Sequence, residues 1–249
     1  MSTGARDAFS KVAVLVAVLV AAWQALYWVV GDTAMRSPLS AGAYTLSLLS
    51  GDMLWPHARE SMLAFAIALA IAVAVGLAIG FVLGYVRGLA EIFEPMLTAI
   101  YSIPKITLYP ILLLLFGLGM SAKVAFGAIH GIIPIALFTL SGVRNVRPVL
   151  VKTGQTMKLG RLDLARRILF PAALPEIFTG LRIGFSLTLI GTLLGEMFAS
   201  QRGIGFLMMN AIGLHNIDLI TALTLLIIIF SATVSSVLLY FDRRLRARL

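Results

Sequence analysis

Residues 62–86 read MLAFAIALAIAVAVGLAIGFVLGYV and contain no charged side chain. A helix of about 20 apolar residues is long enough to cross the hydrocarbon core of a bilayer. The stretch is therefore predicted to span a membrane. Its second half carries Gly76, Gly80 and Gly84. Small residues four apart let another helix approach closely in lipid, either inside one bundle or at a sliding or dimerising interface.

Five further apolar segments follow the same pattern: Val12–Val30, Pro95–Leu118, Val124–Val143, Pro175–Ser200 and Ile217–Phe241. The whole chain is 60% hydrophobic and 12% charged, with a mean hydropathy of +0.99. Soluble domains carry about 25% charged residues. We therefore expect an all-α membrane protein with six transmembrane helices. Pro104, Pro110 and Pro134 are expected to break the regularity of the third and fourth spans.

The first segment also has the basic flank of a signal peptide. It is longer than the roughly 7–15 apolar residues of such peptides, and no clear small-x-small cleavage motif follows it. A retained membrane anchor is the better interpretation.

Basic residues predict the orientation, because cytoplasmic loops are enriched in lysine and arginine. With both termini in the cytoplasm, the outer side receives only Arg36, Arg59, Lys123 and Arg202. Lys105 and Arg182 fall within spans or at their edges. The inner side receives Arg6, Lys11, Arg87, Arg144, Arg147, Lys152, Lys158, Arg161, Arg166, Arg167, Arg243, Arg244, Arg246 and Arg248.

Several function classes are excluded by what the sequence lacks. There is no cysteine, which removes disulfides, thiolate metal sites and a cysteine nucleophile. The net charge of +9 forms no aromatic-interleaved patch, so no nucleic-acid partner is expected. The three histidines have no metal-ligand spacing, and no catalytic residues cluster. No G-x-x-x-x-G-K-[S/T] occurs, so the chain has no phosphate-binding loop of that type.

The longest inner loop, residues 144–175, reads RNVRPVLVKTGQTMKLGRLDLARRILFPAALP. Two short amphipathic helices are expected in it, at Val149–Leu159 and Leu162–Leu169. They suit docking to a soluble partner, or resting among anionic lipid headgroups.

This loop and its surroundings resemble permeases of binding-protein-dependent ABC importers of the type I fold, nearest the nitrate, sulfonate and taurine group. That family has a loop of the form E-A-A, three residues, Gly, nine residues, I-x-L-P. A gapless match places Ile168 to Pro171 on its end. The resemblance continues in IFEPMLTAIYSIPKITLYPILLLLFGLG (92–119), AALPEIFTGLRIG (172–184) and GEMFASQRGIGFLM (195–208).

The loop also departs from the family pattern. Lys152, Thr153 and Gly154 stand where the family has E-A-A, and Lys158 stands where it has glycine. Gly160 is equivalent only if two residues are deleted. The departure fits either an ATPase with complementary acidic residues or a heterodimer whose second permease keeps the regular loop.

The resemblance implies a coupling helix that docks on a separate ATPase. Its residues would be Val149, Lys152, Thr153, Gly154, Met157, Lys158, Leu159 and Gly160. It also implies two ATPase subunits that bind ATP and Mg, with no cofactor on this chain. Further implied partners are a second permease copy or paralogue, a periplasmic or lipid-anchored solute-binding protein, and the lipid of a bacterial inner membrane. Residues 1–53 would form an N-terminal segment and 54–249 a five-helix permease core.

Polar residues at membrane depth are candidates for the solute pathway, because charges there usually face a cavity or the bundle interior. Lys105 is the candidate for attracting an anionic solute, or else it caps carbonyls freed by the prolines. Glu196 is expected to pair with a basic group or to hold hydrogen bonds. The set is Lys105, Ser102, Thr107, His130, Ser186 and Glu196. A secondary transporter or channel not driven by ATP is the alternative function, and a membrane-embedded enzyme lacks the residues it would need.

Overall fold

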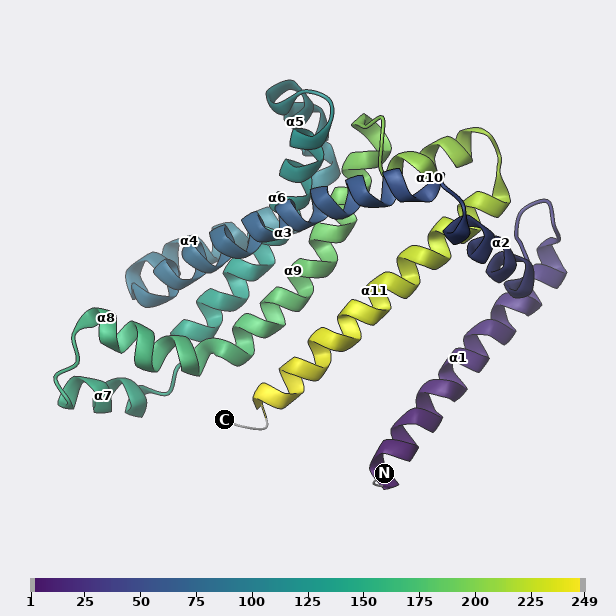
Figure 1. Ribbon diagram of the computed structural model, residues 1–249. Helices are drawn as coiled ribbons and strands as arrows, with labels where there is room; N and C mark the ends of the chain where they lie inside the picture. Colours follow the sequence, from purple (N-terminus) through teal and green to yellow (C-terminus); the bar gives the residue numbers. More distant parts are fainter. Residues whose placement is uncertain (1–2, 247–249) are drawn as a thin grey trace. The chain divides into compact units, whose positions relative to one another are not determined.

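The computed structural model describes residues 3–246, and every element in that range is helical (Figure 1). Of the basic residues that predict the orientation, Arg248 lies outside the described residues. The backbones of Arg6, Arg87 and Arg246 are described, but their side chains are not. The elements are α1 Thr3–Val30, α2 Pro38–Ser50, α3 Leu54–Tyr85, α4 Arg87–Ser102, η1 Lys105–Leu108, α5 Tyr109–Phe116, α6 Met120–Arg144, α7 Pro148–Thr156, α8 Arg161–Leu164, η2 Ala165–Leu169, α9 Phe170–Ala199, α10 Ile204–Gly213 and α11 Ile217–Arg246. The all-α prediction is confirmed.

Among the described residues, five helices are long and apolar enough to cross a membrane, or six if one bent pair counts as a span. The bent pair replaces the predicted third span, since Gly88–Ser102 and Lys105–Phe116 meet at 87°. Pro104 lacks an N–H and forces the preceding Ile103 into extended backbone, with ψ 132°. The predicted break at Pro134 is wrong, because α6 continues through it.

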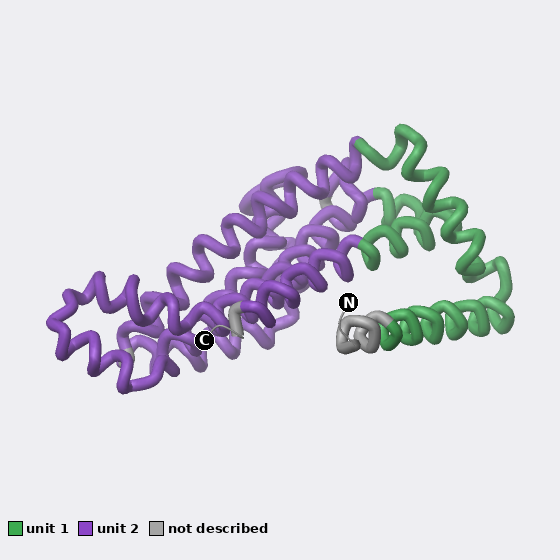
Figure 2. Tube along the Cα trace, turned by 60° about the horizontal axis from the view of Figure 1, so that its bottom comes forward, with its two compact units in different colours: residues 1–55, 207–229 green, residues 56–206, 230–249 purple. Residues whose placement is uncertain are grey.

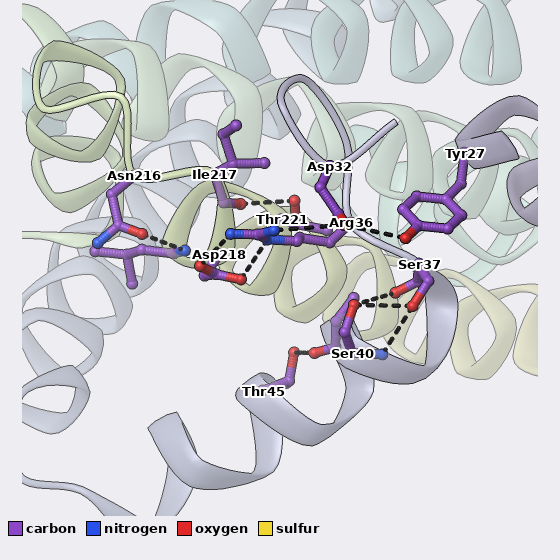
Figure 3. A network of polar contacts seen from close by, with 12 residues as sticks. Tyr27, Asp32, Arg36, Ser37, Ser40, Thr45, Asn216, Ile217, Asp218 and Thr221 are labelled. Atoms are coloured by element: carbon purple, nitrogen blue, oxygen red, sulfur yellow. Dashed lines mark hydrogen bonds and ion pairs between the residues drawn. The ribbon is translucent and has the colours of Figure 1, made fainter. Parts of the chain in front are cut away.

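The chain forms two compact units, residues 1–55 with 207–229, and residues 56–206 with 230–249 (Figure 2). The predicted domain division after residue 53 stays a prediction. In the first unit the α1–α2 connection is tied to the start of α11 by a two-pronged ion pair (Figure 3). Arg36 Nε lies 2.6 Å from Asp218 Oδ1, and its Nη2 lies 2.8 Å from Oδ2.

Helices α6 and α9 form the centre of the second unit, and glycines allow their close approach. A Cβ at Gly180 would lie 2.7 Å from Phe138 Cβ, and one at Gly195 would lie 2.9 Å from Lys123 Cα. Without side chains at these points the two backbones approach to a distance that larger residues forbid.

The glycines of α3 face α6 of the same chain. A Cβ at Gly84 would lie 2.8 Å from both Leu140 O and Val143 Cβ, and one at Gly76 would lie 2.8 Å from Ile135 Cβ. Of the two interpretations of their spacing, packing within one bundle is the one observed. The rings of Phe65, Phe185 and Phe230, with centroids 5.1 to 6.5 Å apart, join α3, α9 and the second half of α11.

Replacing Gly84 tests this packing. We expect Gly84→Leu to lower the free energy of unfolding by about 1–3 kcal/mol, because backbone atoms of α6 cannot move aside. Thermal unfolding of the detergent-solubilised protein would measure the change. Gly88→Leu is the control, since nothing lies within 4 Å of a Cβ there. Equal losses in both variants would contradict the packing.

Candidate functional site: a docking loop and a buried ion network

The short helix predicted at Val149–Leu159 is present but ends earlier than expected, and its docking role stays a prediction. Helix α7 begins with Pro148 in its first turn and ends at Thr156, so Met157, Lys158 and Leu159 lie in the turn that follows rather than in the helix. Apolar side chains remain uncovered here, with Val149 63% and Met157 69% exposed. Exposed apolar side chains at the ends of a short helix suit contact either with a soluble partner or with lipid headgroups.

The backbone around α7 supports the gapless match to the family's loop. Gly154 is buried, and a Cβ there would lie 2.6 Å from the terminal methyl carbons of Leu164 and Ile168. Lys158 has φ of 54°, in the left-handed region that favours glycine. Gly160 has φ of −64°, and nothing lies within 4 Å of a Cβ there. The position that demands glycine-like backbone is thus Lys158, not Gly160.

The predicted second short helix, Leu162–Leu169, is not a separate element. Helix α8 passes into the π-helical turn η2, which continues directly into α9. One continuous helical path, Arg161–Phe198, therefore joins the docking loop to the membrane span.

A buried ion network lies at the Met120 end of α6. Lys123 is 1% exposed, and its Nζ lies 3.0 Å from Glu60 Oε1 and 3.5 Å from Glu196 Oε1. It also donates to Arg202 O at 3.3 Å. Glu196 is fully buried and accepts from Ser61 Oγ at 2.6 Å. The assignment of Lys123 to the outer side stays a prediction, and its burial among carboxylates was not part of that prediction.

The turn before α10 completes this network with three successive backbone N–H groups. Gly203 N donates to His57 Nδ1 at 3.1 Å, Ile204 N to Ser61 Oγ at 2.7 Å, and Gly205 N to Glu196 Oε2 at 3.0 Å. Gly203 has φ of 128°, and the Glu196 carboxyl fills the space a Cβ would need. The side chains of α3 and α9 thereby satisfy the first donors of α10.

The predicted pathway residues do not come together in one place. Glu196 lies in the closed network, and His130 is buried with Nδ1 2.8 Å from Phe126 O. Ser102 and Thr107 are exposed and donate to the carbonyls of Thr98 and Pro104.

Of the other two pathway residues, one lines a groove and the other contacts a residue that lines it. Lys105 Nζ donates to Tyr101 O at 3.1 Å and lies 5.0 Å from that ring's centroid. Ser186 lines the groove itself, as does Tyr101. A role in transport stays a prediction for all six residues.

Apolar helices of this length define a multi-pass membrane protein. The family model described as binding-protein-dependent transport system inner membrane component matches residues 72–249. The chain belongs to this family and is an ABC importer permease subunit of the type I fold.

Curated relatives agree with the family. The chain is 36% identical to the riboflavin transport system permease protein RibX of Chloroflexus aurantiacus, over 80% of this chain and 75% of the relative. It is 28% identical to the taurine transport system permease protein TauC of Escherichia coli, over 64% and 58%. A chain from an inward-facing structure of the MetNI methionine ABC transporter matches the fold with a TM-score of 0.66, at 18% identity, over 78% of this chain and 97% of that one.

Substitutions at Lys158 and Gly160 test the loop match. We expect Lys158→Gly to stabilise the protein or leave it unchanged, and Lys158→Val to destabilise it by about 1–2 kcal/mol, because a β-branched residue resists positive φ. Gly160→Ala is the control and should be neutral. Thermal unfolding of the purified variants decides, and a large loss with Gly160→Ala would favour the match with a deletion.

Removing one partner tests the buried network. We expect Lys123→Met to cost about 3–5 kcal/mol of stability, because it leaves the Glu196 carboxylate buried with no cation beside it. Adding Glu196→Gln should recover part of that loss, since the remaining donors also suit an amide oxygen. Arg202→Met is the matched control, because Arg202 contributes its carbonyl to Lys123 and its side chain is exposed. Strictly additive losses would contradict direct coupling.

Proposed function

We propose that this chain forms the membrane pathway of an ATP-driven importer for a small solute and docks on a separate ATPase through residues 149–160. The observation that carries the proposal is the shape of this loop. A short helix is held against α8 and η2 at the buried Gly154, while Val149 and Met157 stay uncovered. The loop is then fixed in place by this chain, and its free apolar surface is left for a partner.

Basic residues beside α7 support an ATPase with acidic residues at its docking surface. A cavity of about 470 Å³ lies next to the helix. Its lining includes Arg144, Lys152 and Arg161. Arg144 also forms an ion pair with Glu94, 2.5 Å away. An acidic side chain of the ATPase that entered this cavity would meet these cations. The family's regular loop instead has an acidic residue and two alanines at the positions of Lys152, Thr153 and Gly154.

The assembly that follows has two ATPase subunits, which hold ATP and Mg, and a second permease copy or paralogue. A solute-binding protein at the outer face would deliver the solute, in a bacterial inner membrane with both termini of this chain in the cytoplasm. ATP-driven closure of the ATPases would move the two docking loops together and tilt the spans between two rigid-body states. This chain would perform no covalent chemistry.

The proposed solute is small and anionic. Relatives are named for taurine, aliphatic sulfonates and nitrate, which supports an oxyanion, although RibX is named for riboflavin. The cation at Lys105, next to the helix break, supports the same class.

Charged substitutions on the exposed surface test the docking. We expect Val149→Glu with Met157→Glu to abolish recovery of an ABC ATPase in a mild-detergent pull-down, because desolvating two carboxylates opposes docking. Leu39→Glu is the control, since Leu39 is 85% exposed but lies far from this loop in the sequence, in α2.

The co-purifying proteins, identified by mass spectrometry, decide between the functions. Loss of the ATPase only in the loop variant supports the proposal. If no ATPase is recovered with the unaltered chain, and solute uptake persists after ATP depletion, a secondary transporter or channel replaces it.

A further inference from the structure

A groove between α4, α9 and α11 contains a charge that the docking loop and the ion network do not involve. Within residues 56–206 and 230–249, a cavity of about 560 Å³ opens beside the Arg182 side chain. Three hydroxyl side chains share its lining with Tyr101: Ser186, Ser235 and Ser236. The groove therefore combines one guanidinium with several hydrogen-bond donors.

Arg182 lies level with the central part of α6. Helix α6 runs from Met120 to Arg144, which at about 1.5 Å per residue is long enough to cross a bilayer core of about 30 Å. Gly184 lies two residues beyond Arg182, and a Cβ there would lie 2.5 Å from Ile135 Cγ1 and 3.3 Å from Gly131 O. Both contacts are close to the midpoint of α6, so Arg182 stands away from either end of its neighbouring helix.

None of the ion pairs found among the described side chains involves Arg182. Among the side chains that the structure describes, no carboxylate oxygen lies within 4.0 Å of the Arg182 guanidinium. Lys123, by contrast, has two carboxylates. An unpaired cation at this depth is stable only where water or an anion reaches it.

A second positive charge contacts Tyr101 of this groove, although Lys105 itself is not part of the lining. Lys105 Nζ donates to the carbonyl of Tyr101 and lies over its ring. Guanidinium groups bind planar or tetrahedral oxyanions through two parallel N–H donors, and hydroxyl groups can donate to the remaining oxygens.

We propose that this groove binds a small solute carrying an oxyanion group, such as a sulfonate, with Arg182 as its principal ligand and Ser186, Ser235 and Ser236 as further donors. The proposal rests on the proposed pathway function and names the residues that hold the solute inside the membrane.

The absence of cysteine makes the groove accessible to a direct test. A Ser186→Cys variant, in the whole complex in native membranes, is treated with anionic 2-sulfonatoethyl methanethiosulfonate or with its cationic trimethylammonioethyl counterpart. Each rate is divided by that of the same reagent with 2-mercaptoethanol. We expect the anionic reagent to be favoured about tenfold, because the groove concentrates anions.

Arg182 is then varied in the same background. Arg182→Gln should bring the normalised ratio close to one, and Arg182→Lys should retain most of the preference. Any change in thiol ionisation affects both reagents equally and cancels in the ratio. Excess ethanesulfonate should slow labelling by the anionic reagent when residue 182 is arginine, and should not slow it in the Arg182→Gln variant.

An Ile190→Cys variant serves as the matched control on the same helix, since Ile190 is 50% exposed and does not line the groove. It should react slowly with both reagents. A normalised ratio near one with Arg182 in place, or a ratio unchanged by Arg182→Gln, would overturn the proposal.

Labelling needs neither ATP nor an ATPase, so the two proposals fail separately. An anion-selective groove without a co-purifying ATPase would leave the site intact and remove the importer mechanism. A co-purifying ATPase with an unselective groove would remove only the site.

Discussion

The close approach of α6 to α9 is the constraint on which the other features depend. Gly180, Gly184 and Gly195 remove the side chains that would hold the two helices apart. Hydrophobic burial gives little preference for helix contact over lipid contact, so association depends on how closely backbones and side chains fit. That fit places Lys123 beside Glu196 at one end of the seam and Arg182 level with its middle. The seam therefore sets where each charge of these two helices lies.

Lys123 and Arg182 lie in opposite kinds of surroundings. Lys123 is enclosed and fully compensated by two carboxylates and a carbonyl, which makes it a structural group that fixes the start of α10. Arg182 is half-buried and faces a groove. Uncompensated charge among apolar helices is unfavourable, so the same physical cost accounts for the closed network around Lys123 and for the groove left open beside Arg182.

Much of the fold was predictable, because lipid demands long apolar helices and the apolar runs are visible in the sequence. Prolines also indicated the irregular third span, although not its 87° bend. The burial of Lys123 was not predictable, because its partners Glu60 and Glu196 are distant in sequence and only the helix packing joins them. The place of Arg182 along its helix was hidden for a related reason: the helix extends well before Pro175, where the apolar run begins. For the docking loop, the backbone alone distinguishes the two alignments, through the positive φ at Lys158 and the negative φ and open surroundings of Gly160.

The π-helical turn η2 has a consequence for how the docking loop faces the membrane. A π turn fits one more residue than an α turn into about one full rotation. The extra residue within Ala165–Leu169 is therefore taken up with little change in the rotational phase between α8 and α9. Deleting one residue from η2 would turn it into an α turn and leave α7 facing nearly the same way, whereas a deletion in the regular part of α9 would rotate every residue before it by about 100°. The π turn is thus the place where this helix can change its length without changing the direction of the docking surface.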